Sequence, residues 1–234
     1  MYLTRFRINT GRVGARKLLA SPQTMHAAVM TSFAEAPTPG SDGPRVLWRL
    51  DRNSNADTHL CIVSPMRPDL THLVEQAGWP TTARWDTFDY APFLKRLTEG
   101  DTWSFRLTAN PVHSIRRNDG EPTKITAHLS PAHQLGWLLK QQNKAGFTVM
   151  EKPPEKRLVR DQDGRDQDTH DLLVHDRRQF RFAKKGASGP VTVVAVTFDG
   201  RLEITDADAF RAALTHGLGR AKAYGCGLMT LAPA

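Results

Sequence analysis

The sequence GLGRAKAYGCGLMTLAPA, residues 217–234, closes the chain and is preceded by DADAFRAALTHG at 206–217. The preceding segment starts at an aspartate and ends in a glycine, which predicts a helix, and GLMTLAP predicts a final strand. The glycines and cations between them are Gly217, Gly219, Arg220, Lys222, Gly225 and Gly227. Glycines at this density allow positive φ angles and close backbone approach, and the interleaved cations indicate a phosphate backbone as ligand. The spacing is neither a Walker loop nor a Rossmann fingerprint.

The first half of the chain alternates between strand and helix patterns. YLTRFRIN at 2–9 alternates apolar and polar residues, which predicts a half-buried strand. Ser21 followed by Pro22 predicts the start of a helix over about 22–35. Strands are predicted at 45–51 and 59–64, and a helix at 69–78. This order is most of a ferredoxin-like βαββαβ unit.

The second half repeats this order. A strand is predicted over 103–112, and a helix over 130–146 that Ser130 caps and Gly146 ends. RQFRFAKKGASGPVTVVAVTFDGRLEIT then predicts a strand, a basic turn, a strong strand and a hairpin at Asp199-Gly200. We therefore expect an α+β protein with two tandem ferredoxin-like (RRM-like) domains, over 1–95 and 100–234.

Composition narrows the function classes. The chain has 32 Lys+Arg against 24 Asp+Glu and a net charge of +8, a balance typical of nucleic-acid binding proteins. Its apolar runs are too short for a membrane span, and the amino terminus lacks a secretory apolar region. Cys61 and Cys226 form no disulfide framework and no CxxC motif, which favours a cytoplasmic protein.

Histidine spacing gives no metal signature. The nine histidines contain no HExxH or HxH pair, and we expect no metal and no cofactor. His26 is the candidate for chemistry, because it lies near the start of a predicted helix, where a histidine can contact a phosphodiester. Met30 and Phe33 share its helix face, so a core or boundary histidine is the alternative.

A basic segment is the second candidate site. Arg177, Arg178, Arg181, Lys184 and Lys185 occur within nine residues without an acid, and Phe180 and Phe182 alternate with them. This pattern fits a solvated hairpin tip. It equally fits a basic finger that contacts phosphates along an A-form RNA groove.

Several of these stretches together resemble one known family. MYLTRFRIN, the helix with His26, FRLTANPV at 105–112, GRLEITDADAF at 200–210 and the glycine-rich terminus are similar to the CasE family. These are the repeat-processing endoribonucleases of the type I-E CRISPR Cascade complex. The similarity extends over the whole chain and is weakest at about 150–170.

The resemblance implies a function. Family members have two ferredoxin-like domains, bind a CRISPR repeat stem-loop, and cut at the 3′ base of the stem without metal. The cut leaves a 2′,3′-cyclic phosphate, and the crRNA stays bound with the other Cascade subunits. His26 aligns with the catalytic histidine, and Arg181, Lys184 and Lys185 with a positively charged strand pair. Arg220 and Lys222 fall in the RNA-holding glycine loop.

One position departs from the family pattern. The family often has a tyrosine three residues before the histidine, where this chain has Gln23. Glutamine can hydrogen-bond a phosphate or ribose but is no phenolic acid or base. A non-catalytic crRNA-binding subunit of the same complex therefore stays an alternative. A generic RRM-like chaperone would need stacking aromatics, and Tyr2 and Phe6 fit a core face better.

Overall fold

The computed structural model describes residues 1–35, 43–53, 57–79, 84–115, 123–157, 168–182 and 190–234. The first half contains these elements: β1 (Tyr2–Ile8), α1 (Val13–Ala20), α2 (Pro22–Met30), β2 (Leu47–Arg52), β3 (Thr58–Ser64), α3 (Thr71–Ala77), β4 (Trp85–Asp89) and α4 (Ala91–Arg96). The second half contains β5 (Thr102–Ala109), β6 (Val112–Ile115), β7 (Lys124–Ala127), α5 (Pro131–Gln142), η1 (Asn143–Ala145), β8 (Phe147–Val149), η2 (Pro154–Lys156), β9 (Leu172–Phe182), β10 (Val191–Ile204), α6 (Ala207–His216), η3 (Lys222–Tyr224) and β11 (Met229–Pro233).

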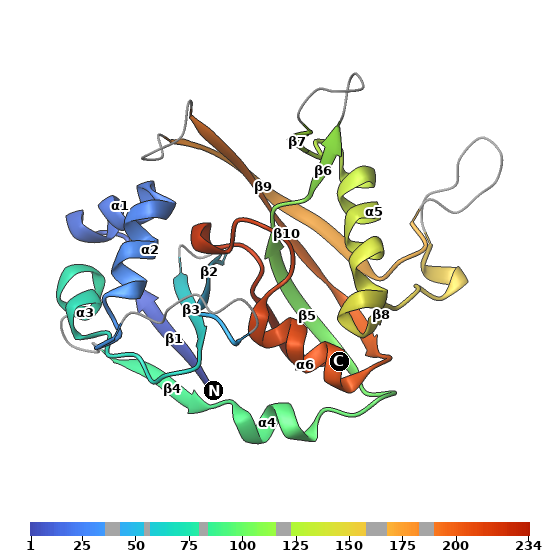
Figure 1. Ribbon diagram of the computed structural model, residues 1–234, viewed down its shortest axis with the longest axis horizontal. Helices are drawn as coiled ribbons and strands as arrows, with labels where there is room; N and C mark the ends of the chain where they lie inside the picture. Colours follow the sequence, from blue (N-terminus) through green and yellow to red (C-terminus); the bar gives the residue numbers. More distant parts are fainter. Residues whose placement is uncertain (36–42, 54–56, 80–83, 116–122, 158–167, 183–189) are drawn as a thin grey trace.

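Two antiparallel sheets share one topology (Figure 1). The first sheet has the order β2-β3-β1-β4, and the second has β11-β5-β10-β8, with β9 also paired to β10. In each, the first and third strands of a βαββαβ unit are central, and the second and fourth flank them. This arrangement is the ferredoxin-like fold, present twice, and it confirms the predicted fold class.

Side-chain caps start the helices where the sequence predicts them. The Ser21 hydroxyl accepts a hydrogen bond from the Thr24 amide at 3.3 Å, and the Ser130 hydroxyl accepts one from the His133 amide at the same distance. Asp206 accepts one from the Ala209 amide at 2.9 Å. These caps satisfy amides that have no partner within the helix.

In the first sheet, β3 and the first half of β2 are buried on both faces. Phe6, Trp48 and Leu60 pack towards α1, α2 and α3. The alternate residues, among them Leu47 and Cys61, join a second apolar cluster that is shared with the second sheet. The helices cover one face of the first sheet and the second sheet lies on its other side, as Figure 1 shows.

Three local predictions need correction. The hairpin expected at Asp199-Gly200 is wrong, because β10 continues through both residues and pairs there with β5 and β9. The helix expected to reach residue 35 ends at Met30. Helix α1 was not predicted, and its N-cap residue, Arg12, provides no side-chain cap to mark its start.

Candidate functional site

His26 lies half-buried in α2 and has one defined partner. The indole Nε1–H of Trp48, on β2, donates to His26 Nδ1 at 3.3 Å. Burial lowers the pKa of His26 below 6.5. The imidazole is therefore neutral at pH 7, with one nitrogen occupied. Gln23 lies three residues earlier in α2 and so shares its helix side.

The predicted glycine loop lies against this helix. Gly217, Gly219, Gly225 and Gly227 have φ angles of 77°, 73°, 78° and 93°. A side chain at these positions would be strained, which explains the glycine density. At Gly225 an added Cβ would lie 2.7 Å from Trp48 Cζ3, so the loop backbone packs directly on the indole. Element η3, within the loop, contacts α2. The fold thus brings the loop beside His26.

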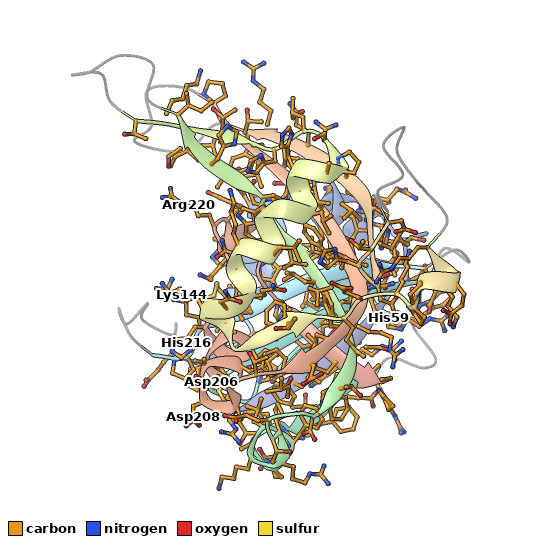
Figure 2. All side chains as sticks on the ribbon, turned by 90° about the vertical axis from the view of Figure 1, so that its right-hand side faces the viewer. His59, Lys144, Asp206, Asp208, His216 and Arg220 are labelled. Carbon is orange, nitrogen blue, oxygen red and sulfur yellow. The ribbon has the colours of Figure 1, made fainter. Side chains whose placement is uncertain are left out.

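The cations of the loop face a basic region. Arg220 is exposed and Lys222 is half-buried. Burial, and then the charge of Arg45, lower the pKa of Lys222. Lys144, His216 and Lys222 line an open cleft beside α5 and α6, and Figure 2 shows Lys144, His216 and Arg220 along the same side of the molecule. Within the described residues no ion pair involves Arg220 or Lys222, so both remain available for phosphate oxygens.

Strand β9 presents the second predicted group of cations. Arg177 and Arg181 are exposed, whereas Phe180 and Phe182 turn inwards against the small cluster of Val193, Ala195 and Cys226. The ring of Phe182 also lies 4.7 Å from that of Tyr224 in η3, centroid to centroid. The predicted alternation of packed and charged faces is therefore present, and β9 is tied to the glycine loop. Lys184 and Lys185 lie outside the described residues.

A cleft between the two halves places Arg178 of the basic segment near Arg52, a cation that the sequence analysis did not single out. It is lined by Trp48, Arg52, Arg178 and Tyr224, among others. Burial, and next the charge of Arg178, lower the pKa of Arg52. Arg178 also pairs with Asp176 at 2.8 Å. Arg52 comes from the first sheet and Arg178 from β9, so only the tertiary fold places them near the partner of His26.

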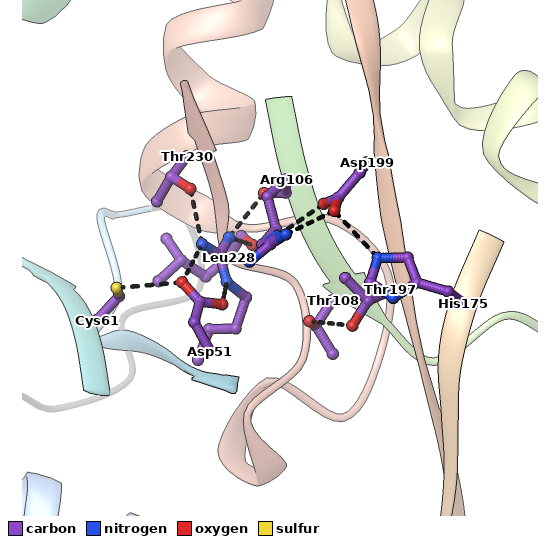
Figure 3. Close-up of polar contacts among 10 residues, drawn as sticks. Asp51, Cys61, Arg106, Thr108, His175, Thr197, Asp199, Leu228 and Thr230 are labelled. Carbon is purple, nitrogen blue, oxygen red and sulfur yellow. Dashed lines mark hydrogen bonds and ion pairs between the residues drawn. The ribbon is translucent and has the colours of Figure 1, made fainter. Parts of the chain in front are cut away.

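A polar network fixes the two sheets against each other (Figure 3). The Arg49 side chain is 2% exposed and pairs with Asp51 at 2.6 Å. Its Nη1 donates to the backbone carbonyls of Arg106 and Leu228, and its Nη2 donates to Thr230 Oγ1. This network holds β2 against β5 and against the start of β11 in the second sheet.

Side chains that could bind a metal do not converge on one centre in the described parts of the chain. No group of three His, Cys, Asp or Glu that could hold a metal ion occurs there. His113, His128 and His133 stack with centroid separations of 4.3 and 5.8 Å, in a column rather than around a common centre. Among these same residues, no helix is long and apolar enough to cross a membrane.

Comparisons with known proteins cover the whole chain. A family model described as "CRISPR associated protein" matches residues 1–233. The CRISPR-associated endoribonuclease Cse3 of Thermus thermophilus is 30% identical over 236 residues, covering 100% of both chains. The CRISPR system Cascade subunit CasE of Escherichia coli is 32% identical over 145 residues, 59% of this chain and 61% of that protein. A solved structure of Cse3 bound to a 19-nucleotide RNA covers 100% of both chains, with a TM-score of 0.76 and 27% identity.

Proposed function

Because the chain belongs to the CRISPR-associated protein family that includes Cse3 and CasE, we propose that it is an endoribonuclease of CRISPR repeat RNA. It binds the repeat stem-loop, cuts at the 3′ base of the stem, and retains the crRNA as a Cascade subunit. The observation that carries this proposal is the packing of the glycine loop on Trp48, the partner of His26.

The chemistry follows from RNA itself. The neighbouring 2′-hydroxyl attacks the scissile phosphorus, the 5′-oxygen leaves, and a 2′,3′-cyclic phosphate remains. The protein has to hold the nucleotides in line and stabilise the charge of the phosphorane. His26 is the group that we place at the scissile phosphate, and no step requires a metal ion.

Other residues hold the RNA. The backbone of the glycine loop, with Arg220 and Lys222, binds the phosphates next to the cut. Arg181, an exposed cation on β9, contacts the stem through phosphate charge, and Lys184 and Lys185 are proposed to do the same by resemblance to the family. Gln23 hydrogen-bonds a phosphate or ribose beside His26. The half-buried setting of Lys222, where burial and the charge of Arg45 lower its pKa, supports an anionic ligand.

The same proposal includes the partners of the protein, its location and its domain boundary. The partners are repeat RNA and the other Cascade subunits, and the site of action is the cytoplasm, where such RNA is processed. We place the domain boundary between 1–95 and 100–234, since the first sheet ends with β4 and the second starts with β5.

A non-catalytic role in the same complex is the second candidate. Gln23, in place of a phenol, is the feature that favours it. In that case the protein holds the crRNA through the same loop and cations but makes no cut.

One experiment separates the two. A labelled repeat hairpin from the host's CRISPR array is incubated in EDTA with wild-type protein and with His26→Ala, and the product ends are mapped. We expect a single cut at the 3′ base of the stem, a cyclic phosphate, and a loss of about 100- to 10,000-fold in the variant with binding retained. Tight binding without a cut by the wild type supports the non-catalytic role. Loss of binding in the variant makes His26 structural.

A further inference from the structure

We propose that Trp48 is a positioning residue that holds His26 in the neutral tautomer with its proton on Nε2, so that the imidazole meets the scissile phosphate as a hydrogen-bond donor. The proposal rests on the proposed RNA cleavage and adds the form in which the histidine acts. The sequence alone leaves the proton role of His26 open.

The tautomer follows from the donor. An indole nitrogen donates and cannot accept, so the nitrogen that faces it must carry a lone pair. That nitrogen is His26 Nδ1, 3.3 Å from Trp48 Nε1. In the neutral ring the proton is then on Nε2. Protonation of Nδ1 would set two N–H groups against each other and leave the indole N–H without its acceptor.

Trp48 is held from two sides. Its side chain packs in the apolar cluster below α1 and α2, with the whole residue 2% exposed. On another side Gly225 touches the ring, where even a methyl group would lie 2.7 Å from Cζ3. The indole therefore cannot swing away from His26 without moving the glycine loop. The nucleotides that this loop binds are thereby coupled to the position of the imidazole.

The surroundings favour the neutral ring. Burial lowers the pKa of His26, in the same direction as a donor to the neutral form. Titratable groups on the elements packed near it are Arg16 and Lys17 of α1, His72 and Glu75 of α3, Arg49, Asp51 and Arg52 of β2, His175, Asp176, Arg177, Arg178 and Arg181 of β9, and Lys222 and Tyr224 of η3. Within the described residues no carboxylate hydrogen-bonds to His26, and burial is what disfavours its charged form.

The reaction balances without a charged histidine. A bond forms between the 2′-oxygen and phosphorus as the bond from phosphorus to the 5′-oxygen breaks. Solvent water accepts the 2′-hydroxyl proton, and solvent returns a proton to the 5′-oxygen. The Nε2–H stabilises the phosphorane oxygen by a hydrogen bond and is not consumed. A neutral histidine serves as an electrophile in this way in triosephosphate isomerase.

The tautomer is tested by NMR of the intact protein without RNA. Ring ¹⁵N shifts of His26 are expected to show the proton on Nε2 and a pKa below 6.5. Trp48→Phe removes the donor, and the tautomers are then expected to mix and the pKa to rise. Trp103→Phe is the matched control, because the Trp103 Nε1 is buried without a partner among the described residues. A proton on Nδ1, or an unchanged pKa in Trp48→Phe, overturns the assignment.

Cleavage assays test the second part of the proposal, that the Nε2–H of His26 acts as a hydrogen-bond donor in the reaction. Single-turnover rates of the wild type are expected not to fall between about pH 6 and pH 9, because no imidazolium is needed. Trp48→Phe is expected to slow cleavage by up to about 100-fold, the lower effect of losing one preorganised donor, with hairpin affinity retained. Trp103→Phe should stay within about twofold of the wild type. A rate that falls as pH rises assigns an imidazolium acid and refutes the proposal.

Two controls keep the outcomes distinct. If Trp48→Phe does not fold, benzothienylalanine at position 48 keeps the shape of the indole and removes only the N–H. If the wild type binds the hairpin but never cuts it, the proposed cleavage and the donor role both fail, whereas the NMR titration still decides the tautomer.

Discussion

Arg49 donates through Nη1 to the carbonyl oxygen of Leu228 at 3.1 Å, across 179 residues of sequence. The contact joins an edge strand of the first sheet to the residue that precedes β11 in the second. Trp48, the next residue back along β2, faces the opposite side of the sheet and reaches His26. Because successive side chains of a strand point to opposite faces, Arg49 contacts the second sheet, whereas Trp48 contacts His26, the catalytic candidate.

Removing the contacts by which Arg49 joins the two sheets is expected to destabilise the whole protein. Arg49→Met leaves Asp51 without its buried partner and two backbone carbonyls without their donor. We expect a loss of about 3–5 kcal/mol in the free energy of unfolding, measured by urea titration. The control is Arg7→Met, which breaks an exposed pair with Asp57 and should cost at most about 1 kcal/mol. Equal losses in the two variants would contradict this role.

Asp51 makes part of the stability pH-dependent. Burial alone raises its pKa, but the hydrogen bonds and charge of Arg49, together with the charge of Arg106 and a hydrogen bond from Cys61, outweigh burial and leave the pKa below 3.8. A carboxylate whose pKa is lower in the folded state stabilises the protein at pH values above its pKa in the unfolded state. This stabilisation is lost as the pH falls from there through the folded-state pKa. Asp51→Asn should therefore lose less stability than the wild type between pH 7 and pH 3. The exposed Asp86→Asn is the control, and a loss like that of the wild type is expected there.

The glycine loop offers a matched pair of substitutions. Gly225 and Gly100 have similar φ angles, 78° and 84°, so alanine is strained at both. Only at Gly225 would the new methyl group meet another group, the indole of Trp48. Gly225→Ala should thus unfold at lower urea than Gly100→Ala, and its cleavage rate should fall at least tenfold further. Similar rates in the two variants would show that the contact with Trp48 is unimportant for cleavage.

The exposed cations of β9 are expected to act by charge. Replacing Arg177 and Arg181 by Glu should weaken binding of the repeat hairpin and flatten its dependence on salt. Each lost phosphate contact lowers the slope of log K against log salt by about 0.7 to 0.9. Hairpin affinity at several salt concentrations measures this. Replacing Lys95 and Arg96 of α4 by Glu makes the same charge change away from the site and should leave the slope unchanged.

Local rules predicted much of the fold. Ser21, Ser130 and Asp206 mark helix starts through short-range hydrogen bonds, and these starts are confirmed. The hairpin predicted at Asp199-Gly200 is wrong because β10 pairs there with β5 on one side and with β9 on the other, which keeps the chain extended. Strand pairing between residues far apart in the chain cannot be recognised from a short stretch of sequence.

The candidate site was only partly predictable. His26, the glycine loop and the β9 cations came from motif and resemblance. Trp48 and Arg52 did not, since in the sequence they read as ordinary strand residues. Their importance arises from tertiary contacts: Trp48 reaches a histidine 22 residues away, and Arg52 faces a cation on another sheet.

The two buried cysteines can be used to measure local opening of the protein. Cys61 lies in the core shared by both sheets, and Cys226 belongs to the glycine loop and is buried against Val193 and Ala195; burial raises the pKa of their thiols to about 11 and about 12. In the closed molecule both thiols are therefore protonated and inaccessible to alkylating reagents. Alkylation of Cys61 measures how often the halves part, and alkylation of Cys226 measures how often the loop lifts. Timed labelling with and without RNA thus reads the two motions separately, with no added probe.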